Sequence, residues 1–176
     1  MSFPERFCYW VDALNDWVGR LVSWVTALVV VVVFVDVVMR YAFNTSFVFT
    51  QEAEWHLFAF IFLIGAGYTL LHDGHVRVDI IYQRLGIKGR AWINLCGVIL
   101  FLIPGCLMVI TTSWKFAANS FAMLEGSPDP GGIPLRFILK GCIPLGFTLL
   151  LLLGFSLAIH SVMQILGVEK EKEDQS

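Results

Sequence analysis

Four apolar stretches, each near the length of a membrane span, constrain the fold of this chain more than any other feature. They cover about residues 18–39, 55–71, 92–112 and 137–166. A helix needs about 20 apolar residues to cross the hydrocarbon core of a bilayer, where the backbone must satisfy its own hydrogen bonds. With 57% hydrophobic and 15% charged residues, the chain is predicted to be an all-α integral membrane protein with four transmembrane helices.

The remaining segments are too short to form a second core, so residues 1–176 are predicted to form a single membrane domain. An amphipathic lead-in with Trp10 and Trp17 precedes the first span, as is typical of membrane interfaces. Short interfacial helices are expected between spans, and the charged tail, about residues 168–176, is expected to be disordered. Pro104 is expected to kink the third span.

The distribution of lysine and arginine predicts the orientation of the chain. If the N-terminus lies inside, the inner segments carry eight cations: Arg6, Arg20, Arg77, Arg84, Lys88, Arg90, Lys170 and Lys172. The outer segments then carry four: Arg40, Lys115, Arg136 and Lys140. Because cytoplasmic loops are enriched in cations, both termini are predicted to be cytoplasmic. A net charge of −2 gives no reason to expect a nucleic-acid partner.

The stretch "LLHDGHVRVDI", Leu70–Ile80, concentrates polar residues directly after an apolar span. A metal site could use His72 and His75 with Asp73 or Asp79, but this spacing is common by chance, and no Cys or third His lies nearby to complete three or four fixed ligands. A catalytic site would need a nucleophile or a paired acid, and the stretch holds no Ser or Cys. We therefore expect an interfacial elbow toward anionic phospholipid, with no cofactor and no enzymatic activity. Its residues are His72, Asp73, His75, Arg77, Asp79, Arg84, Lys88 and Arg90.

Taken together, several stretches of the chain resemble one transporter family. They are "RYAFNTSFVFTQEAEWHLFAFIFLIGAGYTLLHDGHVRVDI" and the later "SPDPGGIPLRFILK". The chain resembles the small, DctQ-type permease subunit of tripartite ATP-independent periplasmic (TRAP) transporters. The resemblance implies a bacterial inner-membrane symport system that takes up an organic acid with sodium. It also implies two protein partners, a large permease subunit that carries the substrate and a periplasmic substrate-binding protein.

Asp36 lies well inside an apolar run, and Arg40 follows one helical turn later. An internal ion pair is favoured over an ion-binding site because neighbouring opposite charges neutralise each other. Arg40 is also expected to receive the binding protein, together with Asp36, Asn44 and Ser46. Close helix packing is expected at small-residue spacings, which are typical of membrane helix contacts. The residues concerned are Gly65, Gly67, Thr69, Gly154 and Ala158.

Secondary transporters build their sites from repeated, broken helices. This sequence shows no repeat, and Pro104 is read as its one clear mid-span breaker. The chain is therefore expected to act as a scaffold without a transport site. The alternative is a haem-binding membrane anchor of a redox complex, which needs two histidines at one depth. His56 and His160 fall near opposite membrane faces, and His72 lies at a helix exit, so that alternative is disfavoured.

Overall fold

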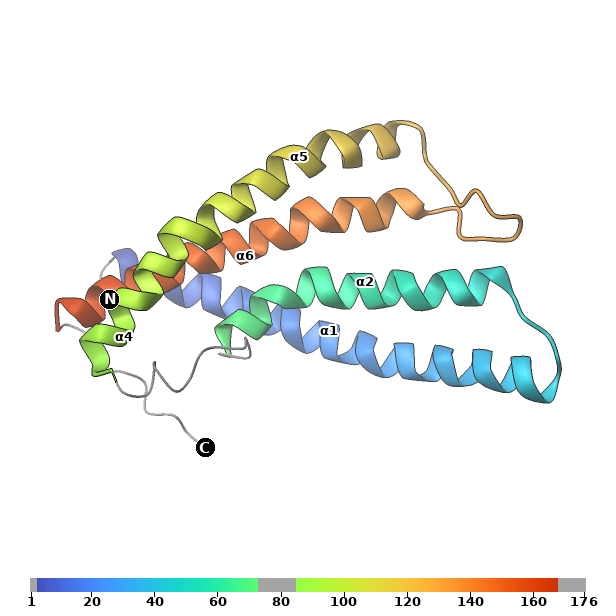
Figure 1. Ribbon diagram of the computed structural model, residues 1–176, viewed down its shortest axis with the longest axis horizontal. Helices are drawn as coiled ribbons and strands as arrows, with labels where there is room; N and C mark the ends of the chain where they lie inside the picture. Colours follow the sequence, from blue (N-terminus) through green and yellow to red (C-terminus); the bar gives the residue numbers. More distant parts are fainter. Residues whose placement is uncertain (1–2, 73–84, 168–176) are drawn as a thin grey trace.

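The computed structural model describes residues 3–72 and 85–167, which form a bundle of long helices (Figure 1). Within these residues, four helical stretches are long and apolar enough to span a membrane: Phe3–Ala42, Val48–Leu71, Ile87–Ala122 and Arg136–Ile165. This finding confirms the predicted all-α membrane architecture. The elements in chain order are α1 (Phe3–Ala42), α2 (Val48–Leu71), α4 (Ile87–Gly97), the π-helical η1 (Val98–Leu102), α5 (Ile103–Ala122) and α6 (Arg136–Ile165).

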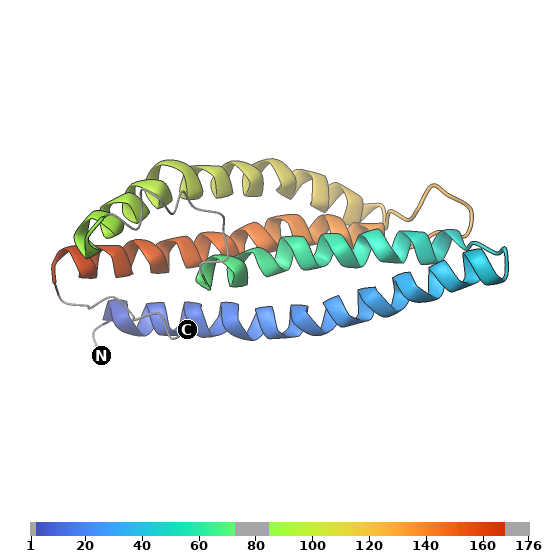
Figure 2. The ribbon, with the colours of Figure 1, turned by 60° about the horizontal axis from the view of Figure 1, so that its bottom comes forward.

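The bundle has two ends of different character (Figures 1 and 2). The terminus end holds the starts of α1 and α4 and the ends of α2 and α6. The loop end holds two connections, residues 43–47 between α1 and α2 and residues 123–135 between α5 and α6. The chain crosses the bundle four times in succession, so the starts and ends of its helices alternate between the two ends.

Helix α1 is continuous over 40 residues, so the amphipathic lead-in and the first span expected from the sequence form one helix. At 1.5 Å per residue it is about 60 Å long, roughly twice the thickness of the hydrocarbon core. Its first turns therefore extend beyond the core at the terminus end. Trp10 and Trp17 lie on this part with 69% and 60% of their surface exposed, which suits side chains at headgroup level.

Two prolines shape the later spans. The π-helical η1 comes directly before Pro104 in the long stretch Ile87–Ala122, and Figure 2 shows that this stretch is curved. Proline has no backbone N–H and cannot donate the hydrogen bond that an α-helix needs at its position. The π-helical turn before it is a local adjustment of the helix at this point. Pro144 lies inside α6, which stays helical from Arg136 to Ile165.

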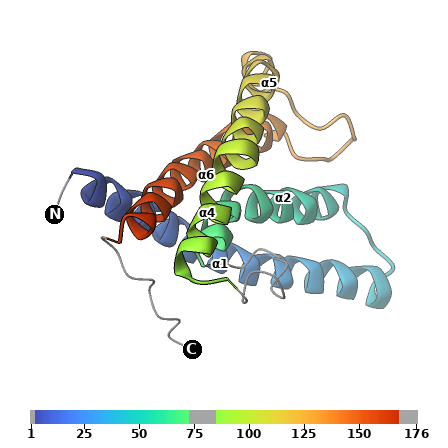
Figure 3. The same ribbon diagram turned by 60° about the vertical axis from the view of Figure 1, so that its left-hand side comes forward.

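Helix α6 is the central element of the bundle. It packs against α1, α2, α4 and α5, and Figure 3 shows it between α1 and α5. Buried Val22, Ile64 and Cys142 bring α1, α2 and α6 together in a small core. Most large apolar side chains face outward instead; Phe34, Phe58, Phe62 and Phe101 are 67%, 67%, 73% and 77% exposed. Lipid or partner helices must cover these faces.

Glycines allow the helices to approach closely. A Cβ on Gly19 of α1 would lie 1.9 Å from the Tyr68 ring of α2, and one on Gly146 of α6 would lie 2.3 Å from the backbone oxygen of Leu63. Such separations leave no room for a side chain. The two glycines therefore set the α1–α2 and α2–α6 contacts.

Candidate functional site

Glu52, the fifth residue of α2, joins the start of that helix to the long connection between α5 and α6. Its side chain is buried, with 5% of the residue exposed. One carboxylate oxygen accepts a hydrogen bond from Ser127 Oγ, and the other accepts one from the backbone N–H of Ile133 at 2.6 Å. A Cβ on Gly132 would lie 2.6 Å from Glu52 Oε2, so glycine is needed for this close approach. We call these four residues the Glu52 latch.

A second carboxylate, Glu125, fixes the other side of the same connection. Lys140 Nζ lies 2.5 Å from Glu125 Oε2, and Ser120 Oγ donates to that oxygen at 2.7 Å. The hydrogen bond from Lys140, followed by that from Ser120, lowers the pKa of Glu125 below its ordinary value. Glu125 is therefore ionised at neutral pH and ties the end of α5 to the start of α6.

Aromatic and cationic side chains gather beside the Glu52 latch. The Arg136 guanidinium lies 5.4 Å from the centre of the Trp55 ring, and His56 Nδ1 lies 2.7 Å from the backbone oxygen of Glu52. The sequence alone did not predict Glu52 and Glu125 as anchors. The available signal was the Gly-Gly pair at 131–132 in a Pro-rich connection, because glycine permits close approach of a backbone to another group.

The Asp36–Arg40 pair lies near the loop end of α1. Arg40 Nη2 lies 2.5 Å from Asp36 Oδ2, and the two side chains are 48% and 4% exposed. Asn44 has a φ of 49°, in the left-handed region that Asn tolerates. Ser46 Oγ accepts a hydrogen bond from Gln51 Nε2 at 2.7 Å. Arg40, Asn44 and Ser46 thus form an exposed polar edge, and their docking role stays a prediction.

At the terminus end, acidic residues of α1 reach the other helices. Asp16 Oδ1 lies 3.3 Å from His72 Nε2 of α2. Asp12 accepts a hydrogen bond from Ser156 Oγ of α6 at 2.7 Å and lies 3.4 Å from His160. These contacts tie α1 to α2 and α6 close to the ends of the helices.

The predicted interfacial elbow is only partly described by the structure. His72 is the C-cap residue of α2, Lys88 is exposed on α4, and Arg90 Nε donates to the Leu85 oxygen at 3.1 Å. The other elbow residues lie outside the described ranges: Asp73, His75, Arg77, Asp79 and Arg84. The lipid-facing role of this segment stays a prediction.

The predicted packing residues lie as follows. A Cβ on Gly67 would lie 2.1 Å from Asn15 Oδ1 of α1, and one on Gly154 would lie 2.4 Å from the Leu102 side chain. Gly65 is less tightly enclosed, with a Cβ distance of 3.3 Å to Val22. Thr69 Oγ1 donates to the Gly65 oxygen at 3.2 Å, and Ala158 is half-buried on α6.

Chemistry at a metal or haem has no support in the described part of the chain. In residues 3–72 and 85–167, the structure brings together no group of three His, Cys, Asp or Glu side chains able to hold a metal ion. Two of the histidines considered as haem ligands instead face carboxylates, His72 beside Asp16 and His160 beside Asp12.

The Glu52 latch leads to a prediction about the loop end. Glu52→Ala removes both acceptors at once, so the 123–135 connection should loosen and become accessible to protease in detergent solution. Glu52→Gln is the control: its amide oxygen can accept from Ile133 while its NH₂ donates to Ser127 Oγ. We expect cleavage within 126–134 to be at least about tenfold faster for Glu52→Ala. Equal cleavage rates in the wild type and Glu52→Ala would contradict the latch.

Known proteins match a large part of the chain. The profile of a family described as "Tripartite ATP-independent periplasmic transporters, DctQ component" matches residues 29–166. A Haemophilus influenzae protein assigned by name as a TRAP transporter small permease protein is 31% identical over 106 residues, which are 58% of this chain and 65% of that protein. No solved structure matches the chain significantly.

The four apolar helices define a multi-pass membrane protein, and the family match places it among the transporters. Because the profile covers most of its length, the chain belongs to the DctQ component family of the TRAP transporters. It is therefore a small TRAP transporter subunit, which confirms the resemblance seen in the sequence.

Proposed function

We propose that this chain is the scaffold subunit of a sodium-coupled TRAP importer for an organic acid. It would pack against the large permease subunit in the bacterial inner membrane and would not itself form the transport site. Family membership is the observation that carries this proposal. The outward-facing apolar helices support it, because aromatic side chains on α1, α2 and η1 are available to a partner's helices.

The placement of charge supports a scaffold role. The described charged residues belong to the terminus end or the loop end, and the long middle sections of the helices are apolar. Four carboxylates reach other segments of this chain, Asp12 and Asp16 at one end and Glu52 and Glu125 at the other, and Asp36 pairs with Arg40 on its own helix. Those contacts stabilise the bundle itself and leave its apolar outer faces for a partner.

The loop end would face the periplasm. In this orientation both termini are cytoplasmic, and the excess of inner lysine and arginine supports it. Arg40, Asn44 and Ser46 would then meet the substrate-binding protein, next to a connection that Glu52 and Glu125 hold in place. An ordered surface loses less entropy when a partner docks.

Co-purification tests the packing proposal. When the tagged chain is expressed with the untagged large subunit, we expect both in a stable complex in mild detergent. Three variants each remove an exposed aromatic ring from one outward-facing helix surface: Phe34→Ala on α1, Phe62→Ala on α2 and Phe101→Ala on η1. The variant on the contacting face should reduce recovery of the large subunit, and the other two serve as its controls. A large subunit that never co-purifies with the wild-type chain would contradict the proposal.

A further inference from the structure

Tryptophan and leucine recur on α1 at intervals of seven residues. The two series are Trp10, Trp17 and Trp24, and Leu14, Leu21 and Leu28. Together they advance along the helix in alternating steps of three and four residues, the spacing at which a second helix packs alongside at a small angle. The exposed fractions of the six residues run from 41% to 78%. The described helices of this chain therefore leave this side of α1 largely open.

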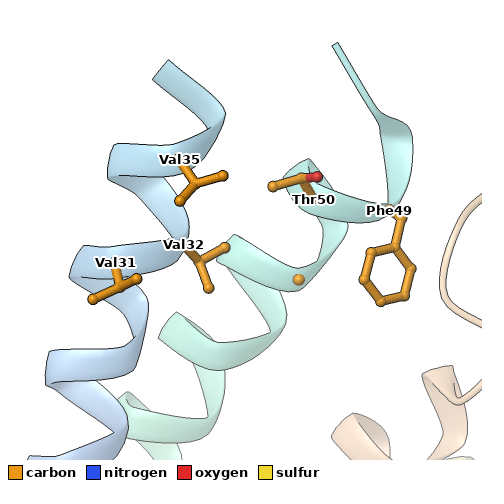
Figure 4. A pocket seen from close by; sticks show the side chains of 6 residues that line it. Val31, Val32, Val35, Phe49 and Thr50 are labelled. Carbon is orange, nitrogen blue, oxygen red and sulfur yellow. The ribbon is translucent and has the colours of Figure 1, made fainter. Parts of the chain in front are cut away.

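The same spacing continues in both directions along α1. It takes in Phe7 and Phe3 toward the terminus end, and Val31 and Val35 toward the loop end. Val31 and Val35 also line an apolar pocket beside α2 (Figure 4). We call the whole series, from Phe3 to Val35, the α1 seam. The seam runs through the membrane span and past it, so a protein that covers its full length needs a membrane-crossing helix of its own.

Lipid cannot cover the start of the α1 seam. No charged residue lies between Arg20 and Asp36, so the hydrocarbon core ends near Arg20 on the terminus side. From Arg20 to Phe3 the helix rises about 25 Å, or roughly 20 Å at a tilt of about 40°, whereas the headgroups add only about 5–8 Å on each side of the core. This part also cannot lie flat on the bilayer, because Asp12 on another face accepts a hydrogen bond from Ser156 of α6.

One flank of the α1 seam is basic, and the other is occupied by the bundle. Val11 is buried on the bundle side. Arg6 and Arg20 lie on the open flank, each one residue before a seam position, and the Arg20 side chain is 75% exposed although it pairs with Asp16. A helix lying on the seam would meet these two cations, and carboxylates on that helix would complement them. A second copy of this chain offers arginine or valine on its own seam flanks and no carboxylate.

We propose that the α1 seam is the docking surface for a membrane-crossing helix of the large permease subunit. That helix would continue past the membrane at the terminus end and carry carboxylates opposite Arg6 and Arg20. The inference rests on the proposed function and assigns its packing contact to one face of α1. An aromatic side chain buries about 150–250 Å², so the seam from Phe3 to Leu21 offers on the order of 600 Å². A stable interface takes about 800 Å² from each partner, and the membrane part of the seam supplies the rest.

Crosslinking in the co-purified complex tests the surface. The photoreactive residue p-benzoylphenylalanine replaces Leu14 in the seam or, as the control, Trp92, which is 55% exposed on α4. On illumination we expect a covalent link to the large subunit from position 14 and none from position 92. If the complex forms without a link at position 14, or with equal links at both positions, the inference is overturned while the proposed function stands. A link from position 14 to a second copy of this chain also overturns it. Absence of any complex with the wild-type chain contradicts both.

Substitutions along the seam measure its contribution. Trp10→Ala combined with Trp17→Ala should lower recovery of the large subunit at least about fivefold, whereas Tyr9→Ala, at a 60% exposed position off the seam, should leave it unchanged. The subunit alone should stay monodisperse in all variants, because these rings face outward. Arg6→Gln combined with Arg20→Gln should remove most of the salt sensitivity of the complex. Wild-type recovery in the tryptophan variant, an equal fall in Tyr9→Ala, or unchanged salt sensitivity in the arginine variant overturns the proposal.

Discussion

Gly146→Ala should destabilise the subunit more than any other single methyl group added to its helices. The new Cβ would lie 2.3 Å from the backbone oxygen of Leu63 and 2.8 Å from its carbonyl carbon. Both atoms belong to the α2 backbone and cannot turn away as a side-chain tip could, so α2 and α6 must separate. Overpacking of this kind costs about 1–3 kcal/mol. The check is the melting temperature of the purified subunit in detergent.

Gly141→Ala is the matched control on the same helix. Nothing lies within 4 Å of the Cβ it would add, and alanine favours helix over glycine by up to about 1 kcal/mol. Its melting temperature should equal or exceed that of the wild type. Gly146→Leu should fail to give a monodisperse subunit. If Gly146→Ala melts at the wild-type temperature, the close α2–α6 approach at this position is wrong.

Arg40→Glu should abolish uptake by the complete transporter while leaving the amount of assembled complex normal. The substitution places a second carboxylate beside buried Asp36 and reverses the charge of the edge proposed to receive the binding protein. Like charges across an interface cost several kcal/mol and slow association. We expect uptake to fall by at least about tenfold at low salt, where steering by charge is strongest. Substrate uptake in cells and complex recovery by affinity purification are the measurements.

Asp36→Asn is the control for Arg40→Glu. It removes the internal partner and keeps the exposed cation, so uptake should fall less than in Arg40→Glu. Failure of Arg40→Glu to assemble would make the residue structural. Normal uptake by an assembled Arg40→Glu complex would contradict docking at Arg40, and the outer surface would then be sought at Lys115, Arg136 and the 123–135 connection.

The sequence was sufficient to predict the architecture because a membrane restricts the choice of fold. Apolar length alone marks a spanning helix. Three of the four predicted spans lie within helices of the structure, and the fourth ends one residue beyond α6. The helix ends were less predictable. α2 begins at Val48, seven residues before the predicted span, and has no side-chain cap. The sequence also did not predict the π-helical turn ahead of Pro104. This turn depends on how the helix adjusts to the absence of a backbone N–H at Pro104.

The contacts across the loop end could not be found from local patterns. Glu52 lies 75 residues from Ser127 and 81 from Ile133, and an acidic residue near the start of a helix is already explained by the helix dipole. Gly146 was missed for a similar reason: Leu150 follows it four residues later, so it does not fit the small-residue spacing. The Asp36–Arg40 pair could be predicted from the sequence because the two residues are four apart on one helix.

Uptake by reconstituted vesicles tests the scaffold account most directly. One set of proteoliposomes holds this chain alone, and another holds it with the large permease subunit. Both receive an inward sodium gradient and the binding protein loaded with its organic acid. The account predicts uptake only where the large subunit is present. Reproducible sodium-driven uptake by this chain alone would contradict it.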